Sequence, residues 1–136
     1  MQQRRIGPFQ VSAIGLGCMN LSHAYGAPPP VEQAEALLLG ALDQGVTLFD
    51  TAALYGFGAN ESLVGRVLKP HRSQITLCSK GGMAGVTFPD GVKRVIDGTP
   101  AAIRRNSSRG ESPSGNAYSP ACSRSATPSS RPRMRQ

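Results

Sequence analysis

Short apolar runs alternate with amphipathic helical segments over residues 10–80, and few folds accommodate that order. Residues 46–49 and 75–79 are apolar runs of strand length, while residues 10–17 alternate loosely between polar and apolar types. Residues 31–44 and 60–68 carry apolar side chains at helical spacing between these runs. Strands that alternate with helices in this way form right-handed βαβ units. The sequence therefore predicts an α/β fold with a parallel sheet.

Local signals mark the ends of the predicted elements. Gly7-Pro8 can turn a short hairpin ahead of the first strand, and Gly45 is placed to end the first helix. Asn60 is placed to cap the second helix, and Thr99-Pro100 provides a cap and a first-turn proline for a further helix. The predicted order is hairpin, strand, helix, strand, helix, strand, a loop over residues 81–98, and the start of a helix.

Two polar residues follow the second and third predicted strands. Asp50 comes directly after the run at residues 46–49, and Lys80 follows the run at residues 75–79. Parallel strands bring their carboxyl ends to one edge of the sheet, which is where α/β enzymes place their reacting groups. We therefore expect Asp50 and Lys80 to lie side by side.

The residues around Asp50 carry a family resemblance. Residues 45–56, which read Gly-Val-Thr-Leu-Phe-Asp-Thr-Ala-Ala-Leu-Tyr-Gly, are followed by Asn60-Glu61 and Gly65, and together they resemble the hallmark segment of the aldo-keto reductases. Residues 11–19 and Ser79-Lys80 look like the same family, so the resemblance runs over about residues 4–105. It implies a (β/α)8 barrel, represented here by the N-terminal hairpin and the first three βα units. It also implies reduction of an aldehyde or ketone to an alcohol by NADPH, without a Rossmann fold.

The resemblance also implies which residues act. The family uses a tetrad of Asp, Tyr, Lys and His, and the first three fall on Asp50, Tyr55 and Lys80. No His follows His71, so the fourth tetrad residue has no counterpart.

A cofactor site follows from the same resemblance. Gly17, Cys18 and Met19 would line the NADP(H) cleft together with Asp50. Gly15-Leu16-Gly17 also suggests a dinucleotide-binding turn of the Rossmann type, but the third glycine is missing and prolines follow where a helix should begin.

The predicted catalytic residues suit carbonyl reduction chemically. A hydride that reaches a carbonyl carbon leaves negative charge on oxygen, so a proton donor is needed within hydrogen-bond reach. A phenol, with an ordinary pKa of about 10, is a slow acid near neutral pH, and a nearby ammonium favours its anion. Lys80 would do this for Tyr55, and Asp50 would hold Lys80. Taken singly, each residue also has an ordinary interpretation, as a loop Tyr, a strand-end Lys or a turn-capping Asp.

Cysteine usage and hydropathy bear on the compartment. Cys18, Cys78 and Cys122 are far apart, so they match neither a disulfide framework nor a metal site. No apolar run approaches the roughly 18–20 residues of a membrane span, and no secretory signal is readable at the N-terminus. We expect a cytoplasmic protein without a metal.

The chain changes character after residue 105. Of the net charge of +7, residues 106–136 supply +4 (five Arg and one Glu), and they contain nine Ser and four Pro but no Leu, Ile, Val or Phe. Such a segment buries too little apolar surface to offset the ordering of its backbone, so we expect a disordered basic tail. An abrupt switch of this kind also fits out-of-frame translation of a GC-rich gene, and we expect a truncated chain to be inactive alone.

A basic tail raises a second function class. Arg124, Arg131, Arg133 and Arg135 could contact the phosphates of a nucleic acid or another polyanion, in a non-catalytic fragment whose binding weakens as salt is added. Against this, the tail holds one aromatic residue, Tyr118, and no Lys. A small carbonyl compound remains the expected partner.

Overall fold

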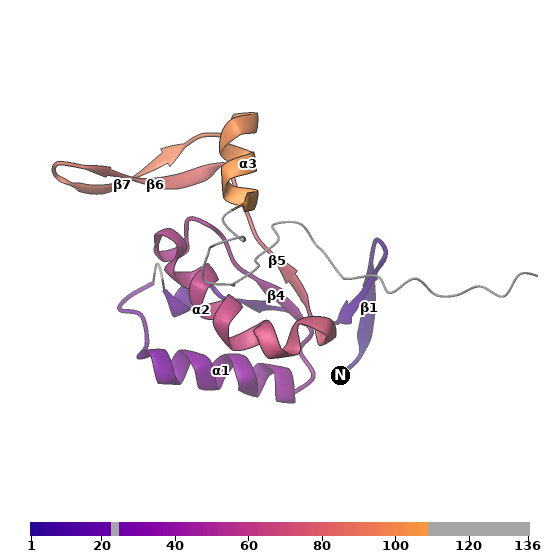
Figure 1. The fold of residues 1–136 in the computed structure, drawn as a ribbon. Coiled ribbons are helices and arrows are strands. Elements are labelled where there is room, and N and C mark those ends of the chain that lie inside the picture. The colour runs from indigo at the N-terminus through magenta and orange to yellow at the C-terminus, as the bar shows by residue number, and fades with distance from the viewer. Residues whose placement is uncertain (23–24, 109–136) are drawn as a thin grey trace, which may run out of the picture.

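A hairpin opens the fold. The computed structural model describes residues 1–22 and 25–108 (Figure 1). Strand β1 (Gln3–Ile6) pairs antiparallel with β2 (Phe9–Ser12). Gly7 lies in the turn with φ of 55°, a left-handed conformation that glycine adopts without steric cost. The predicted hairpin is confirmed.

A three-stranded parallel sheet follows. It joins β3 (Leu16–Gly17), β4 (Leu48–Asp50) and β5 (Thr76–Cys78) in that order. Both neighbouring pairs run parallel, and Asp50 stands opposite Gly17 on one side and Cys78 on the other. The predicted parallel sheet is therefore confirmed, and the carboxyl ends of its strands are level with one another.

Two α-helices connect these strands. Helix α1 (Val31–Asp43) leads into β4, and α2 (Ala59–Leu68) leads towards β5. The two helices lie side by side along the sheet (Figure 1), and Arg66 of α2 forms an ion pair with Glu35 of α1 at 2.5 Å. Short 3-10 turns complete the connections: η1 (Met19–Leu21), η2 (Tyr55–Gly58) and η3 (Lys69–Gln74).

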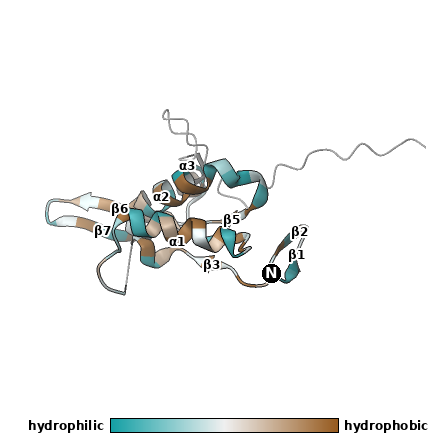
Figure 2. Ribbon diagram, turned by 90° about the horizontal axis from the view of Figure 1, so that it is seen from below, coloured by the Kyte–Doolittle hydropathy of each residue, from teal (hydrophilic) through white to brown (hydrophobic). Residues whose placement is uncertain are grey.

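The core lies between the helices and the sheet. Helix α1 carries both hydrophobic and hydrophilic residues (Figure 2), and the buried ones are Ala34 and Leu38, which lie four residues apart on one face. Fully buried side chains come from both helices and from the strands, namely Leu38, Phe49, Val64, Leu68 and Ile75. The helical spacing seen in the sequence therefore places one stripe of each helix against the apolar strands.

The prediction of a loop over residues 81–98 is wrong. Strand β6 (Met83–Phe88) and β7 (Gly91–Ile96) form an antiparallel hairpin there. Phe88 pairs with Gly91, which leaves Pro89 and Asp90 as a two-residue turn. Proline favours the first inner position of such a turn, and glycine favours its exit. Pro89, Asp90 and Gly91 therefore suit the tight turn of a hairpin.

The described residues end in a third helix. Helix α3 (Pro100–Ser108) begins where Thr99-Pro100 predicted, and the Ala102 N–H donates to the Thr99 hydroxyl at 3.3 Å. Residues 109–136, which include most of the predicted tail, lie outside the described residues. Within the described part of the chain the strands form no closed barrel. None of the helices described there is long and apolar enough to cross a membrane.

Neighbouring leucines of α1 provide a matched test of the core. Leu38 is fully buried, whereas Leu39 is 39% exposed. We expect Leu38→Ala to lower the free energy of unfolding by about 2–5 kcal/mol, because a cavity adds to the lost transfer energy. Leu39→Ala should cost about 1 kcal/mol or less. Urea unfolding followed by circular dichroism measures both, and equal losses would contradict this assignment of the core face.

Candidate active site

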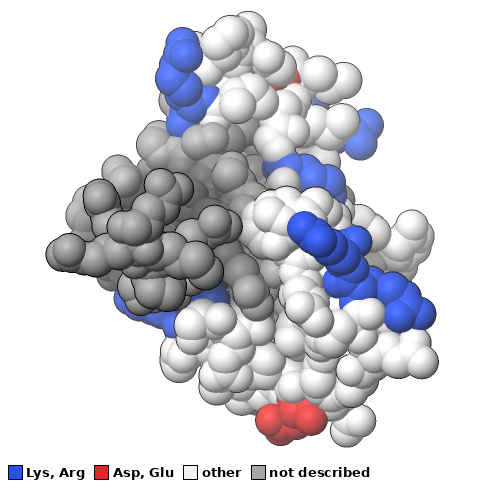
Figure 3. All heavy atoms as spheres, turned by 90° about the vertical axis from the view of Figure 1, so that its right-hand side faces the viewer, with Lys and Arg blue, Asp and Glu red and all other residues white. Residues whose placement is uncertain are grey.

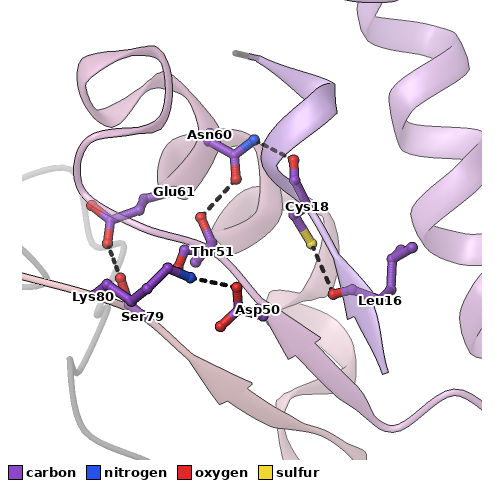
Figure 4. Close-up of polar contacts among 8 residues, drawn as sticks. All are labelled: Leu16, Cys18, Asp50, Thr51, Asn60, Glu61, Ser79 and Lys80. Atoms are coloured by element: carbon purple, nitrogen blue, oxygen red, sulfur yellow. Dashed lines mark hydrogen bonds and ion pairs between the residues drawn. The ribbon is translucent and has the colours of Figure 1, made fainter. Parts of the chain in front are cut away.

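Asp50 and Lys80 meet at the carboxyl edge of the sheet. Asp50 ends β4, and Lys80 lies two residues beyond the end of β5. The Lys80 ammonium donates a hydrogen bond to Asp50 Oδ1 (Figure 4). It donates a second, at 2.9 Å, to the Thr51 carbonyl. The two charged side chains are about half exposed, at 48% for Lys80 and 45% for Asp50. The expectation that they lie side by side is confirmed.

Backbone hydrogen bonds continue beyond the strand ends and explain this contact. The Thr51 N–H donates to the Cys78 carbonyl at 2.9 Å, and the Ala53 N–H donates to the Lys80 carbonyl at 3.2 Å. The segment after β4 therefore runs beside the segment after β5. Lys80 reaches Asp50 because these two segments are held together by their main chains.

Tyr55 completes the group of predicted catalytic residues. It is half-buried at the start of η2, and the Lys80 Nζ lies 5.0 Å from the centroid of its ring. Burial alone would lower the pKa of Lys80, but hydrogen bonds to Asp50 and Tyr55, with the charges of both groups, raise that pKa above its ordinary value. The charged form of Lys80 is therefore favoured beside the phenol.

The turn that carries Tyr55 has an unusual backbone. Gly56, Phe57 and Gly58 all adopt positive φ, at 57°, 51° and 99°. Among the described residues Phe57 is the one non-glycine in this region, where L side chains are strained. A Cβ on Gly56 would lie 3.0 Å from atoms of Ser22, so this turn packs closely on the segment that follows β3. The turn sets the direction in which the chain leaves Tyr55 for α2.

The three predicted cofactor residues of the β3 end differ in their surroundings. Gly17 pairs with Asp50, and a Cβ built on it would meet nothing within 4 Å. Met19 is half-buried. Cys18 is fully buried, and its thiol faces the Leu16 carbonyl at 3.7 Å. Space is therefore open over Gly17 beside Asp50, whereas the Cys18 side chain faces the protein interior.

Two further residues of this region were misinterpreted or missed in the sequence. Asn60 does not cap α2, because the helix starts one residue earlier and Gly58 is its N-cap. The Asn60 side chain is instead fully buried and bonds to Thr51 and to the Cys18 carbonyl. Glu61 accepts a hydrogen bond from the Ser79 hydroxyl at 2.6 Å. Asn60-Glu61 belongs to the segment that carries the family resemblance, but no local pattern in the sequence indicates these long-range contacts.

Outside the candidate site, the described charged and metal-ligating side chains do not gather into a second cluster. Within residues 1–22 and 25–108, no three His, Cys, Asp or Glu side chains come together as a metal site would require. On the face shown in Figure 3, the Lys and Arg side chains lie in separate groups rather than one continuous band. The group of Asp50, Tyr55 and Lys80 is therefore the cluster with the clearest chemistry.

Comparison with known proteins identifies the family. The family model described as the aldo/keto reductase family matches residues 13–134. The chain belongs to the aldo/keto reductase family. The match continues past residue 105, where the resemblance seen in the sequence ended, and its part beyond residue 108 lies outside the described residues.

Individual relatives agree with this assignment. The chain is 41% identical over 97 residues to a probable aldo-keto reductase from Glycine max, covering 71% of this chain and 27% of that protein. It is 46% identical over 81 residues to an aldo-keto reductase from Schizosaccharomyces pombe whose name includes NADP(+), covering 58% and 24% of the two chains. The matched part thus spans about a quarter of the length of these relatives.

Solved structures show the same arrangement of elements. A putative aldo-keto reductase from Pseudomonas aeruginosa matches with a TM-score of 0.67 and 31% identity, over 79% of this chain and 40% of that one. An aldo-keto reductase from Bacillus halodurans, solved in its holo form, matches with a TM-score of 0.64 and 32% identity, over 77% and 33%. The chain covers less than half of each of these solved structures.

Cys18 provides a test of this local structure. Burial raises the pKa of its thiol from 9.0 to about 12. At any pH below 9 the folded chain should therefore hold about a thousandfold less Cys18 thiolate than the unfolded chain, and burial slows access further. Iodoacetamide labelling with peptide mass spectrometry, in buffer and in urea, measures the two rates. A Cys18 rate in buffer within tenfold of the rate in urea would contradict the buried position.

Proposed function

We propose that the chain carries the first three βα units of a (β/α)8 aldo-keto reductase, which reduces an aldehyde or ketone to an alcohol with NADPH. The main support is the contact of Lys80 with Asp50 and Tyr55 at the carboxyl edge of a parallel sheet. That edge is the catalytic face of such barrels. The family match makes this arrangement more than a chance cluster of charges.

In this proposal the chain's own residues donate the proton and stabilise the charge that its loss leaves behind. The chemistry that NADPH would supply, when bound, is a hydride for the carbonyl carbon. The Tyr55 hydroxyl donates a proton to the carbonyl oxygen as negative charge develops there. The Lys80 cation lies next to the Tyr55 ring and favours the phenolate that remains. Asp50 fixes the Lys80 ammonium through an ion pair and balances its charge.

The choice of NADP(H) rests on the family. The relative from Schizosaccharomyces pombe carries NADP(+) in its name. In this chain, Gly17 and Asp50 would border the cofactor, because open space lies over Gly17 and its partner in register is Asp50. Met19, half-buried in the turn that follows, would contribute to the same wall, and Cys18 would support it from inside the protein.

The alternative of a polyanion-binding tail stays a prediction. Its four arginines, residues 124, 131, 133 and 135, lie outside the described residues. Among the described residues, the group of Asp50, Tyr55 and Lys80 supports a small carbonyl compound as the partner.

We expect the isolated chain to bind NADPH weakly or not at all. Holding a dinucleotide needs contacts from several loops of a whole barrel. Hydride transfer further needs the reacting atoms within about 3–3.5 Å of each other, which an unclosed barrel does not enforce. Titration of the chain with NADPH, followed by nucleotide fluorescence, measures this. Saturable binding at micromolar concentrations would contradict the expectation and indicate a more complete site.

The role of Tyr55 can be tested in a complete barrel. Residues 13–105 would replace the matching segment of a full-length relative, and NADPH oxidation would be followed with a panel of aldehydes. Tyr55→Phe should lower kcat by about 10²–10⁴-fold, because a proton donor is removed. Tyr25→Phe is the matched control, since that side chain is 86% exposed. An active chimera that tolerates Tyr55→Phe would refute the assigned role.

A further inference from the structure

Two consecutive residues of α2 contact the ends of all three parallel strands. The Asn60 amide donates to the Cys18 carbonyl, just after β3, at 2.7 Å. It accepts a hydrogen bond from the Thr51 hydroxyl, just after β4, at 2.6 Å. Glu61 accepts from the Ser79 hydroxyl, just after β5, at 2.6 Å (Figure 4). One turn of helix therefore joins segments that are 42, 9 and 18 residues away in sequence.

The Asn60 contacts are buried and well satisfied. Asn60 and Thr51 are both fully buried, as is Cys18. The Asn60 amide nitrogen makes a further hydrogen bond to the Ser22 hydroxyl at 3.1 Å. Buried polar groups that find their partners fix a unique arrangement, because any shift leaves one of them buried and unpaired.

Each contacted residue is next to a residue of the candidate site. Thr51 follows Asp50, and Ser79 precedes Lys80. Cys18 follows Gly17, and its N–H donates to the Asp50 carbonyl at 2.8 Å. Tyr55 lies on the short connection between Thr51 and Asn60, so both ends of that connection are held.

We propose that Asn60 and Glu61 are positioning residues that hold the three strand ends in register, so that Lys80 reaches both Asp50 and Tyr55. The effect of this positioning on catalysis rests on the proposed function, but the geometric role of Asn60 and Glu61 does not. A reacting group misplaced by about 1 Å can lose about a hundredfold in rate, which gives such positioning its value.

The titration of Lys80 in the full chain measures this geometry directly. The chain contains three lysines, at positions 69, 80 and 93, so NMR of labelled lysine Cε carbons gives three signals. Asp50→Asn removes the carboxylate partner and sets the change expected on complete loss of the contact. Glu61→Ala should raise the proton dissociation constant of Lys80 by about threefold or more, because the loosened β5 end weakens the contact with Asp50. Ser79→Ala removes the same hydrogen bond and should have the same effect.

Matched variants separate positioning from charge. Glu61→Gln keeps an acceptor for Ser79 but removes the negative charge, so the Lys80 titration should stay as in the unchanged chain. Thr51→Val removes the hydroxyl that Asn60 accepts from and should shift Lys80 in the same direction as Glu61→Ala. Thr51→Ser keeps the hydroxyl and should not. Circular dichroism confirms that each variant is folded, and the Lys93 signal is the internal reference.

The Lys80 titrations test the positioning role independently of the proposed function. A shift in Glu61→Ala, Ser79→Ala and Thr51→Val that is absent in the two conservative variants supports positioning. An unchanged Lys80 titration in these three variants overturns it, and so does an equal shift in Glu61→Gln and Glu61→Ala, which would indicate an effect of charge alone. Carbonyl reduction is not part of this readout. An active full-length chimera that tolerates Tyr55→Phe, together with an intact Lys80 response in the chain, would refute the proposed catalytic role and leave the positioning role standing.

Discussion

The pairing of β4 with β5, continued past the ends of both strands, is the constraint on which the rest of this structure depends. Phe49 of β4 is fully buried and faces the helices, so the strand is anchored in the core. The next residue, Asp50, ends the strand at the edge where Lys80 arrives from β5. The core and the candidate site are thus set by neighbouring residues of one strand. A shift of β4 by one residue would exchange their sides.

The exposed ion pair between Lys80 and Asp50 is too weak to position these two side chains by itself. The Lys80 and Asp50 side chains are 48% and 45% exposed, and pairs of this kind contribute about 1 kcal/mol or less to folding. The raised pKa of Lys80 shows a local preference for the charged form, and exposure to water limits what that preference adds to stability. The rigid parts are the backbone ladder beyond the strands and the buried group of Thr51, Asn60 and Cys18. The fold therefore places the site, and the site stabilises the fold little.

The sequence predicted most of what local patterns and strand order control. The alternation of apolar runs and helices gave the parallel sheet, and strand order brought Asp50 and Lys80 together. The hairpin β6–β7 was missed because Pro89 and Gly91 serve equally in loops and in tight turns. The role of Asn60 was missed for a different reason. Its partner carbonyl on Cys18 is 42 residues away, and no local pattern indicates a contact over that separation.

The β6–β7 hairpin is only weakly stabilised by the contacts within itself. A hairpin of two strands is marginally stable alone, and several of its apolar side chains are exposed, including Ile96 at 76%. The hairpin packs against the Phe57 ring at Gly85, where a Cβ would lie 2.3 Å from that ring. Only glycine permits this packing, and Phe57 reaches it from a strained left-handed backbone two residues after Tyr55. The residue with the strained backbone, Phe57, is therefore also the residue against which the hairpin packs. A larger side chain at Gly85 would displace Phe57 and with it the turn that carries Tyr55.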